Sequence, residues 1–228
     1  MAWQALLDNV IWHSLHGSQA HLSVGTAHAR RYARGYSPIA GFADAARPDF
    51  SALEAFCEAG EQLYCSGPLE AAPAGWQVDA QTTLMKMVWA APMPAEDAGF
   101  APVRLRPEHV PQMMALAALT RPGPFGPRTL EMGDYFGVFE AEGLIAMAGE
   151  RMFAAPLREI SGVCTDPQFQ GRGLARRLMK GLVRREMQRG ELPFLHVMCG
   201  NSGAIALYRS MGFEARLEMP IRVMSRTA

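Results

Sequence analysis

The sequence lacks an excess of charge of either sign and lacks long apolar runs. Its 22 Lys and Arg residues balance 22 Asp and Glu residues, so the formal net charge is zero. A neutral chain has no overall field that recruits nucleic acid or an anionic membrane. No apolar run approaches the ~18 residues that a membrane-spanning helix needs. We therefore expect neither nucleic acid nor a membrane as a partner.

The sequence has few cysteines, and their spacing matches no common cysteine motif. The four cysteines, Cys57, Cys65, Cys164 and Cys199, form no C-x-x-C pair and show no histidine spacing typical of zinc. The N-terminus has no basic segment before an apolar stretch, so it does not resemble a signal peptide. These features predict free thiols, no metal site and a cytoplasmic location.

The composition is that of a globular rather than a disordered chain, with 49% hydrophobic and 19% charged residues. A segment rich in proline, residues 91–102, reads as a connection between two halves. We expect a smaller N-terminal α/β lobe over residues 1–95 and a second domain over residues 100–228. In the second domain, strand and helix patterns predict an α/β fold.

One segment of the second half predicts an anion site. A strand over Glu159–Thr165 leads into the glycine-rich turn 170–173, which opens a helix with apolar residues at helical spacing. The first N–H groups of a helix have no internal partners and carry the positive end of the helix dipole. Glycines let a phosphate approach them, and Arg172 and Arg176 add positive charge. The spacing fits neither a P-loop nor a G-x-G-x-x-G dinucleotide site.

The same segment resembles motif A of the Gcn5-related N-acetyltransferase (GNAT) superfamily, through Gln170, Gly173 and Ala175. A second GNAT signature is matched by residues 201–213, which include Asn201 and Tyr208. The resemblance covers about residues 100–225 and is closest to the FR47-like branch, which includes relatives of glycine N-acyltransferase. It implies a GNAT fold, in which a mixed, twisted sheet is flanked by helices and splays near Thr165 to admit coenzyme A.

The implied activity is direct transfer of an acetyl or longer acyl group from acetyl-CoA to a primary amine, without a metal. A small molecule or an amino acid is the favoured acceptor. The alternatives are a protein or peptide amine, or a non-catalytic acyl-CoA-binding module. A proline- and glycine-rich loop over residues 121–128 distinguishes the first two classes, because a loop that closes the acceptor site favours a small acceptor.

The resemblance also implies which residues bind the cofactor. The backbone of Val163 and Thr165 is expected to pair with the pantetheine arm, and the N–H groups of residues 171–176 to hold the pyrophosphate. Gln170 either stabilises the turn or contacts the ligand, and Asn201 either caps a helix or binds the cofactor. The full expected set is Val163, Cys164, Thr165, Gln170, Gly171, Arg172, Gly173, Leu174, Ala175, Arg176, Asn201 and Tyr208. Strand alternation points the Cys164 side chain to the opposite face.

Two catalytic roles follow from the family pattern. Tyr208 is the expected general acid for the leaving thiolate, with a packing role as the alternative. Glu159 occupies the position of a general-base glutamate, and Glu150 and His196 are rival bases. The identity of the acceptor, the length of the acyl chain, the role of residues 1–95 and the oligomeric state, including a homodimer, stay open at this point.

Basic residues recur along the predicted helix after the glycine turn. A nucleic-acid surface and a solvated helix face both explain such a run. The neutral chain, without interleaved aromatic residues, favours the solvated face. The run consists of Arg172, Arg176, Arg177, Lys180, Arg184, Arg185 and Arg189.

Overall fold

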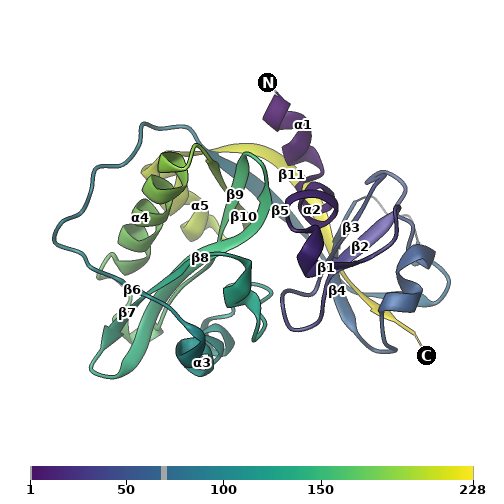
Figure 1. The fold of residues 1–228 in the computed structure, drawn as a ribbon, viewed down its shortest axis with the longest axis horizontal. Coiled ribbons are helices and arrows are strands. Elements are labelled where there is room, and N and C mark those ends of the chain that lie inside the picture. The colour runs from purple at the N-terminus through teal and green to yellow at the C-terminus, as the bar shows by residue number, and fades with distance from the viewer. Residues whose placement is uncertain (1, 68–70, 228) are drawn as a thin grey trace.

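The computed structural model describes residues 2–67 and 71–227. The strands of this part of the chain form one mixed, eleven-stranded sheet in the order β1-β2-β3-β4-β11-β5-β10-β9-β8-β7-β6 (Figure 1). The strands are β1 Ser23–Gly25, β2 Ala29–Tyr32, β3 Ile39–Phe42, β4 Gln62–Ser66, β5 Trp76–Trp89, β6 Val103–Arg104, β7 Tyr135–Glu140, β8 Gly143–Ala154, β9 Leu157–Thr165, β10 Leu192–Met198 and β11 Phe213–Arg226. The α-helices are α1 Ala2–Asp8, α2 Val10–His13, α3 Val110–Thr120, α4 Leu174–Gln188 and α5 Ser202–Met211.

The two halves of the chain share this sheet. Strand β5 belongs to the first 95 residues, yet it lies between β10 and β11 and pairs antiparallel with both. Strand β11, at the other end of the chain, continues along β5 and also pairs with β4. The expected connection over residues 91–102 does join β5 to β6. It therefore separates two stretches of chain, while the sheet runs through both.

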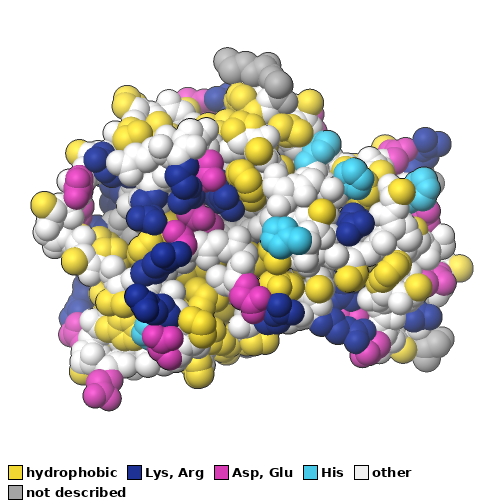
Figure 2. All heavy atoms as spheres, viewed as in Figure 1, with side chains coloured by type: hydrophobic (Ala, Val, Ile, Leu, Met, Phe, Trp, Pro, Cys, Tyr) yellow, Lys and Arg dark blue, Asp and Glu magenta, His cyan; other side chains and the backbone are white. Residues whose placement is uncertain are grey.

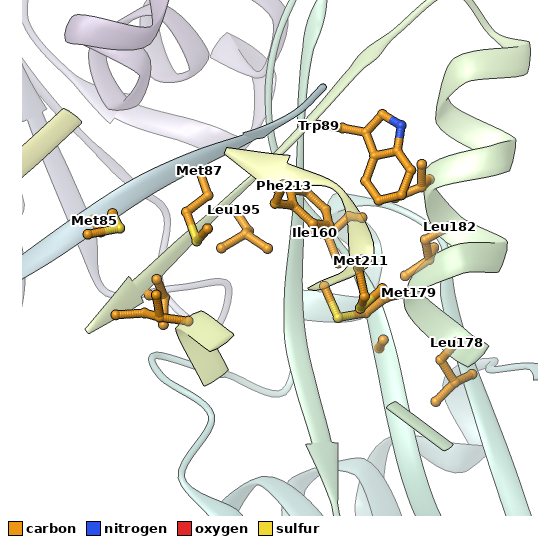
Figure 3. Close-up of a cluster of buried hydrophobic side chains, with 14 of the residues drawn as sticks. Met85, Met87, Trp89, Ile160, Leu178, Met179, Leu182, Leu195, Met211 and Phe213 are labelled. Carbon is orange, nitrogen blue, oxygen red and sulfur yellow. The ribbon is translucent and has the colours of Figure 1, made fainter. Parts of the chain in front are cut away.

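Helices cover both faces of the C-terminal part of the sheet. Helix α4 packs on β8, β9 and β10, and its buried stripe includes Leu178 and Leu182, which face Met87 and Leu195 of the sheet in one apolar cluster (Figure 3). Helix α3 packs on the opposite face of β8 and β9. Burying one such leucine contributes roughly 2 kcal/mol. The predicted α/β class, a mixed sheet flanked by helices, is confirmed.

Strands β9 and β10 are paired only at their beginnings. Residues 192–194 run parallel to residues 157–159. Beyond this point in the described sheet, β10 continues along β5 and β9 continues along β8. The two strands therefore part, and the edge of β9 up to Thr165 is left open toward β10.

Candidate active site

The first cavity lies where β9 leads into α4. It has a volume of about 460 Å³ and brings together strand, glycine turn, helix start and α5. It is lined by Thr120, Val163, Cys164, Thr165, Phe169, Gln170, Gly171, Gly173, Leu174, Ala175, Arg176, Leu207 and Tyr208. Ten of the twelve residues expected from the sequence lie in this lining. The other two, Arg172 and Asn201, do not.

The glycine turn presents an open backbone to this cavity. Gly173 caps α4 in the left-handed region, with φ 73°, and a Cβ on it would meet no atom within 4 Å. The first helical hydrogen bond runs from the Arg177 N–H to the Gly173 carbonyl, so the preceding N–H groups lack helical partners. The buried Oγ1 of Thr165 also has no hydrogen-bond partner among the described residues. These free polar groups fit the pyrophosphate and the amide-bearing arm of coenzyme A.

The residues expected to bind the cofactor differ in what their side chains contact in the structure. Arg176 donates to the Ser210 hydroxyl at 2.8 Å, and Arg172 lies 3.4 Å from Glu140 in an exposed ion pair. Gln170 donates weakly to the Thr165 carbonyl at 3.5 Å, as a turn-stabilising amide would. Cys164 is buried in the apolar cluster under α3, and burial raises the pKa of its thiol to about 11. Its orientation away from α4 agrees with strand alternation.

The second cavity lies on the other side of Tyr208 and has a volume of about 570 Å³. Its lining comes from both halves of the chain: β4, β5 and β11, the loop after α3, the open edges of β9 and β10, and α5. Asn201 lies here rather than in the first cavity, and its Oδ1 accepts from the Ala204 N–H at 3.1 Å as the cap of α5. The two cavities share Thr120, Val163 and Tyr208.

Tyr208 therefore occupies the junction of the cavities. Its ring packs 6.1 Å from that of Phe213, and burial raises the pKa of its phenol. Its hydroxyl makes no hydrogen bond within the described part of the chain. The packing role and the chemical role are thus compatible, because the ring is anchored while the hydroxyl is available.

A buried triad of charged and polar groups stands behind the second cavity. Nδ1 of His196 lies 2.7 Å from Oε1 of Glu159, and Arg151 binds both oxygens of the same carboxylate at 2.7 and 2.9 Å. His196 and Arg151 line the cavity, whereas Glu159 does not and is 1% exposed. Nε2 of His196 is buried and has no hydrogen-bond partner among residues 2–67 and 71–227.

The surroundings set the protonation states of this triad. Burial opposes ionisation of Glu159, but the charge and hydrogen bonds of Arg151, together with His196, hold the pKa of its carboxyl far below its ordinary value. Burial lowers the pKa of His196, although the Glu159 carboxylate opposes that shift. At neutral pH the carboxylate is ionised and the imidazole is neutral. Nδ1 then carries the proton donated to Glu159, and Nε2 keeps a free lone pair.

Glu150, the remaining rival base, lies away from both cavities. Its carboxylate is buried and contacts Arg189 at 2.6 Å and Arg158 at 3.8 Å. It also accepts weakly from the backbone N–H of Asp134 at 3.4 Å. These contacts indicate that Glu150 has a structural role, as a member of a buried network of ion pairs.

Most of the basic residues of α4 form ion pairs or hydrogen bonds with other residues of the chain. Arg177 pairs with Asp97 at 2.7 Å, Arg185 with Asp134 at 3.1 Å, and Arg184 binds the Pro94 carbonyl at 3.0 Å. On the face seen in Figure 2, acidic side chains are interspersed with the basic ones. Arg177 and Arg184 thus tie the connection between the two halves to α4.

No helix in the described part of the chain has both the length and the apolar composition required to cross a membrane. No group of three or more His, Cys, Asp or Glu side chains there is arranged to hold a metal ion.

Comparisons with known proteins agree with the geometry. The family model for "FR47-like protein" matches residues 135–222. A crystal structure of a putative GNAT acetyltransferase from Novosphingobium aromaticivorans is 36% identical, has a TM-score of 0.89, and covers 97% of this chain and 99% of its own. A GCN5-related N-acetyltransferase-like protein from Streptococcus suis is 14% identical with a TM-score of 0.61 over 99% of both chains, which shows a shared fold.

The curated relatives match a shorter region. N-alpha-acetyltransferase RimI of Mycobacterium tuberculosis is 43% identical over 56 residues, which is 25% of this chain and 34% of that protein. The chain thus spans about a third of the length of the first curated relative. The near-complete match to a GNAT structure, together with the family model, is decisive: this chain belongs to the GNAT superfamily, in its FR47-like branch.

Proposed function

We propose that this protein is an N-acetyltransferase that moves the acetyl group of acetyl-CoA directly to the primary amine of a small molecule or an amino acid. The observation that carries the proposal is the meeting of two cavities at Tyr208 and Val163. A thioester held along β9 in the first cavity would present its carbonyl to an amine in the second. Such positioning alone supplies a large share of the rate of a two-substrate reaction.

Tyr208 is the proposed proton donor. The amine nitrogen attacks the thioester carbonyl, the carbon–sulfur bond breaks, and the thiolate leaves with the phenolic proton. A phenol whose pKa is raised by burial stays protonated at neutral pH and can donate. The phenolate then regains a proton from solvent through the open mouth of the cleft.

His196 is the proposed base. The attacking nitrogen must lose a proton. The Nε2 lone pair of His196 belongs to a side chain that lines the second cavity, which we call the acceptor cavity. An imidazole with a lowered pKa is neutral at physiological pH and ready to accept that proton. The developing imidazolium is stabilised by the Glu159 carboxylate, 2.7 Å from Nδ1.

Glu159 is better assigned as a positioning residue than as the base that we expected. Direct transfer to Glu159 would need contact with the acceptor, but its carboxylate is enclosed by Arg151, His196 and the Met152 N–H. A carboxyl with a strongly lowered pKa is also a weak proton acceptor. Its hydrogen bond instead fixes which nitrogen of His196 is free.

The loop that borders the acceptor cavity supports the proposal that the acceptor is a small molecule. Four consecutive residues of the proline- and glycine-rich loop, 121–124, line the second cavity. Pro124 is held in place because its carbonyl accepts from Arg151 at 3.2 Å. A volume of about 570 Å³ is that of a pocket for a small molecule.

A peptide α-amine is the second candidate acceptor. It is supported by the local similarity to an N-alpha-acetyltransferase of Mycobacterium tuberculosis. The third reading, a non-catalytic acyl-CoA-binding module, is opposed by two residues that line the second cavity, Tyr208 and His196, because the Tyr208 hydroxyl and His196 Nε2 have no hydrogen-bond partner among the described residues.

Thiol release from acetyl-CoA tests these readings in one assay. The purified protein would be given small primary amines, amino acids, or a peptide with a free N-terminal amine. Faster release with small amines supports the proposal, and faster release with the peptide supports the second candidate. Tight binding of acetyl-CoA with no release by any amine would leave only the binding module.

A further inference from the structure

We infer that the acceptor is a monoamine whose remaining body is uncharged and largely apolar, and that this body lies on the sheet face contributed by β4, β5 and β11. The inference rests on the proposed acetyl transfer. It gives the N-terminal half of the chain a role in choosing the acceptor, beyond covering the sheet.

The floor of the second cavity is built in register across three strands. Val223 of β11 pairs with Tyr64 of β4 on one side and with Ala80 of β5 on the other. Leu84 of β5 pairs in turn with Met198 of β10. All five side chains line the cavity, and directly paired residues lie on the same face of a sheet. The floor is therefore continuous from β10, beside His196, to β4.

The length of this floor suits an extended body. Neighbouring strands lie about 4.8 Å apart, so three strand spacings carry the floor about 14 Å from β10 to β4. Apart from Thr82 of β5, which pairs with Ile221, and the Tyr64 hydroxyl, its members carry no hydrogen-bonding side-chain group. An apolar chain or ring attached to the amine would bury itself here, whereas a strongly hydrated group would lose more water contacts than these two hydroxyls can replace.

The charges of the lining oppose a second cation. The second cavity is lined by no aspartate or glutamate of the described residues, and its charged members are Arg121 and Arg151. Arg151 is neutralised by Glu159. Arg121, exposed at the end of α3, makes no ion pair within the described part of the chain. The net local charge is positive, so a polyamine or other dication meets repulsion with no carboxylate to offset it.

A matched pair of acceptors tests the charge argument. n-Hexylamine and 1,6-diaminohexane have the same chain, and the diamine adds one ammonium group at the far end. We expect kcat/KM for n-hexylamine to exceed that for the diamine by at least about tenfold, as the added charge costs interaction energy in a partly buried site. The variant Arg121→Glu should narrow this ratio. Arg47→Glu, an exposed arginine outside the cavity, is the control and should leave it unchanged.

A second pair of variants tests the floor itself. Leu84→Ala should raise KM for phenethylamine about tenfold with a smaller change in kcat, because a contact made equally by bound substrate and transition state is lost. Val78→Ala is the control, since Val78 lies on the same strand, is 40% exposed and does not line the cavity. Equal effects of the two variants, or faster turnover of the diamine than of n-hexylamine by the unaltered protein, would overturn the inference while leaving acetyl transfer intact. Binding of acetyl-CoA without thiol release by any amine would overturn the proposed function itself.

Discussion

The imidazole Nδ1 of His196 lies 2.7 Å from the carboxylate of Glu159, and that carboxylate is held on both oxygens by Arg151. This arrangement places the ionised partner behind the histidine and leaves Nε2 without a hydrogen-bond partner among the described residues, on a side chain that lines the acceptor cavity. We expected Glu159 to accept the proton itself, and we now propose that it acts by positioning His196.

Removing the Glu159 charge should destabilise the fold. Glu159→Gln keeps the size of the side chain but leaves Arg151 charged and unpaired in the interior, which costs about 3–5 kcal/mol. Denaturant unfolding would measure this loss. The double variant Glu159→Gln/Arg151→Met should recover most of it, because no uncompensated charge remains. A single variant as stable as the unaltered protein would show that the ion pair contributes little.

The pH dependence of turnover should report His196. Its pKa is lowered by burial, so kcat/KM, calculated per free amine, should rise with pH through a pKa below the ordinary value of about 6.5. His196→Gln should remove this limb and lower turnover about 100-fold, with acetyl-CoA affinity nearly unchanged. If the variant showed the same rise of kcat/KM with pH, that rise would have to be assigned to another titrating group.

The lowered pKa also has a consequence for folding stability. Unfolded His196 binds its proton more tightly than folded His196, so the unfolded state takes up more protons as pH falls below about 6.5. This residue therefore contributes a loss of stability on acidification, which urea titrations at pH 8 and pH 5.5 would detect. The difference between the two pH values should be smaller in His196→Gln.

Tyr208→Phe should separate chemistry from binding. The ring and its packing on Phe213 remain, and only the hydroxyl that protonates the thiolate is lost. We expect kcat to fall about 100-fold while the Kd for acetyl-CoA changes by less than about threefold. Turnover would be followed by thiol release and affinity by calorimetry. Unchanged turnover would reduce Tyr208 to a packing residue.

Gly173→Ala should weaken acetyl-CoA binding at the helix start. Alanine at φ 73° costs about 1–2 kcal/mol of backbone strain, and relief of that strain would reshape the turn that faces the phosphates. Gly181→Ala is the matched control, because Gly181 lies inside α4 where alanine favours the helix by about 1 kcal/mol. Calorimetric titration of both variants with acetyl-CoA would compare them. Equal affinities would contradict the role of the turn.

The C-terminal half was predictable because its signals are local. The strand before Thr165, the glycine turn and the apolar stripe of α4 each follow from neighbouring residues, and the structure places ten expected cofactor residues in one cavity. Asn201 was ambiguous in sequence because a helix cap and a ligand contact use the same amide, and the structure shows the cap.

The acceptor cavity could not be predicted because it depends on long-range pairing. Nothing near Trp76–Trp89 in the sequence indicates that this segment lies between β10 and β11, or that Leu84 lines the second cavity. The same pairing sets His196 beside Lys86, and the short parallel pairing of β10 with β9 brings His196 to Glu159. The sequence presents Glu159 as the expected base and His196 as its rival, and nothing in it indicates that the two side chains are hydrogen-bonded partners.

The most direct test of the account follows the acetyl group itself. The protein would be incubated with acetyl-CoA carrying ¹³C in the acetyl group and with n-hexylamine or phenethylamine, and the products examined by mass spectrometry. We predict labelled N-acetyl amide formed in equal amount to free coenzyme A, and formed about 100-fold more slowly by Tyr208→Phe. Acetyl-CoA that stays intact, or is consumed without formation of an amide with any amine, would contradict it.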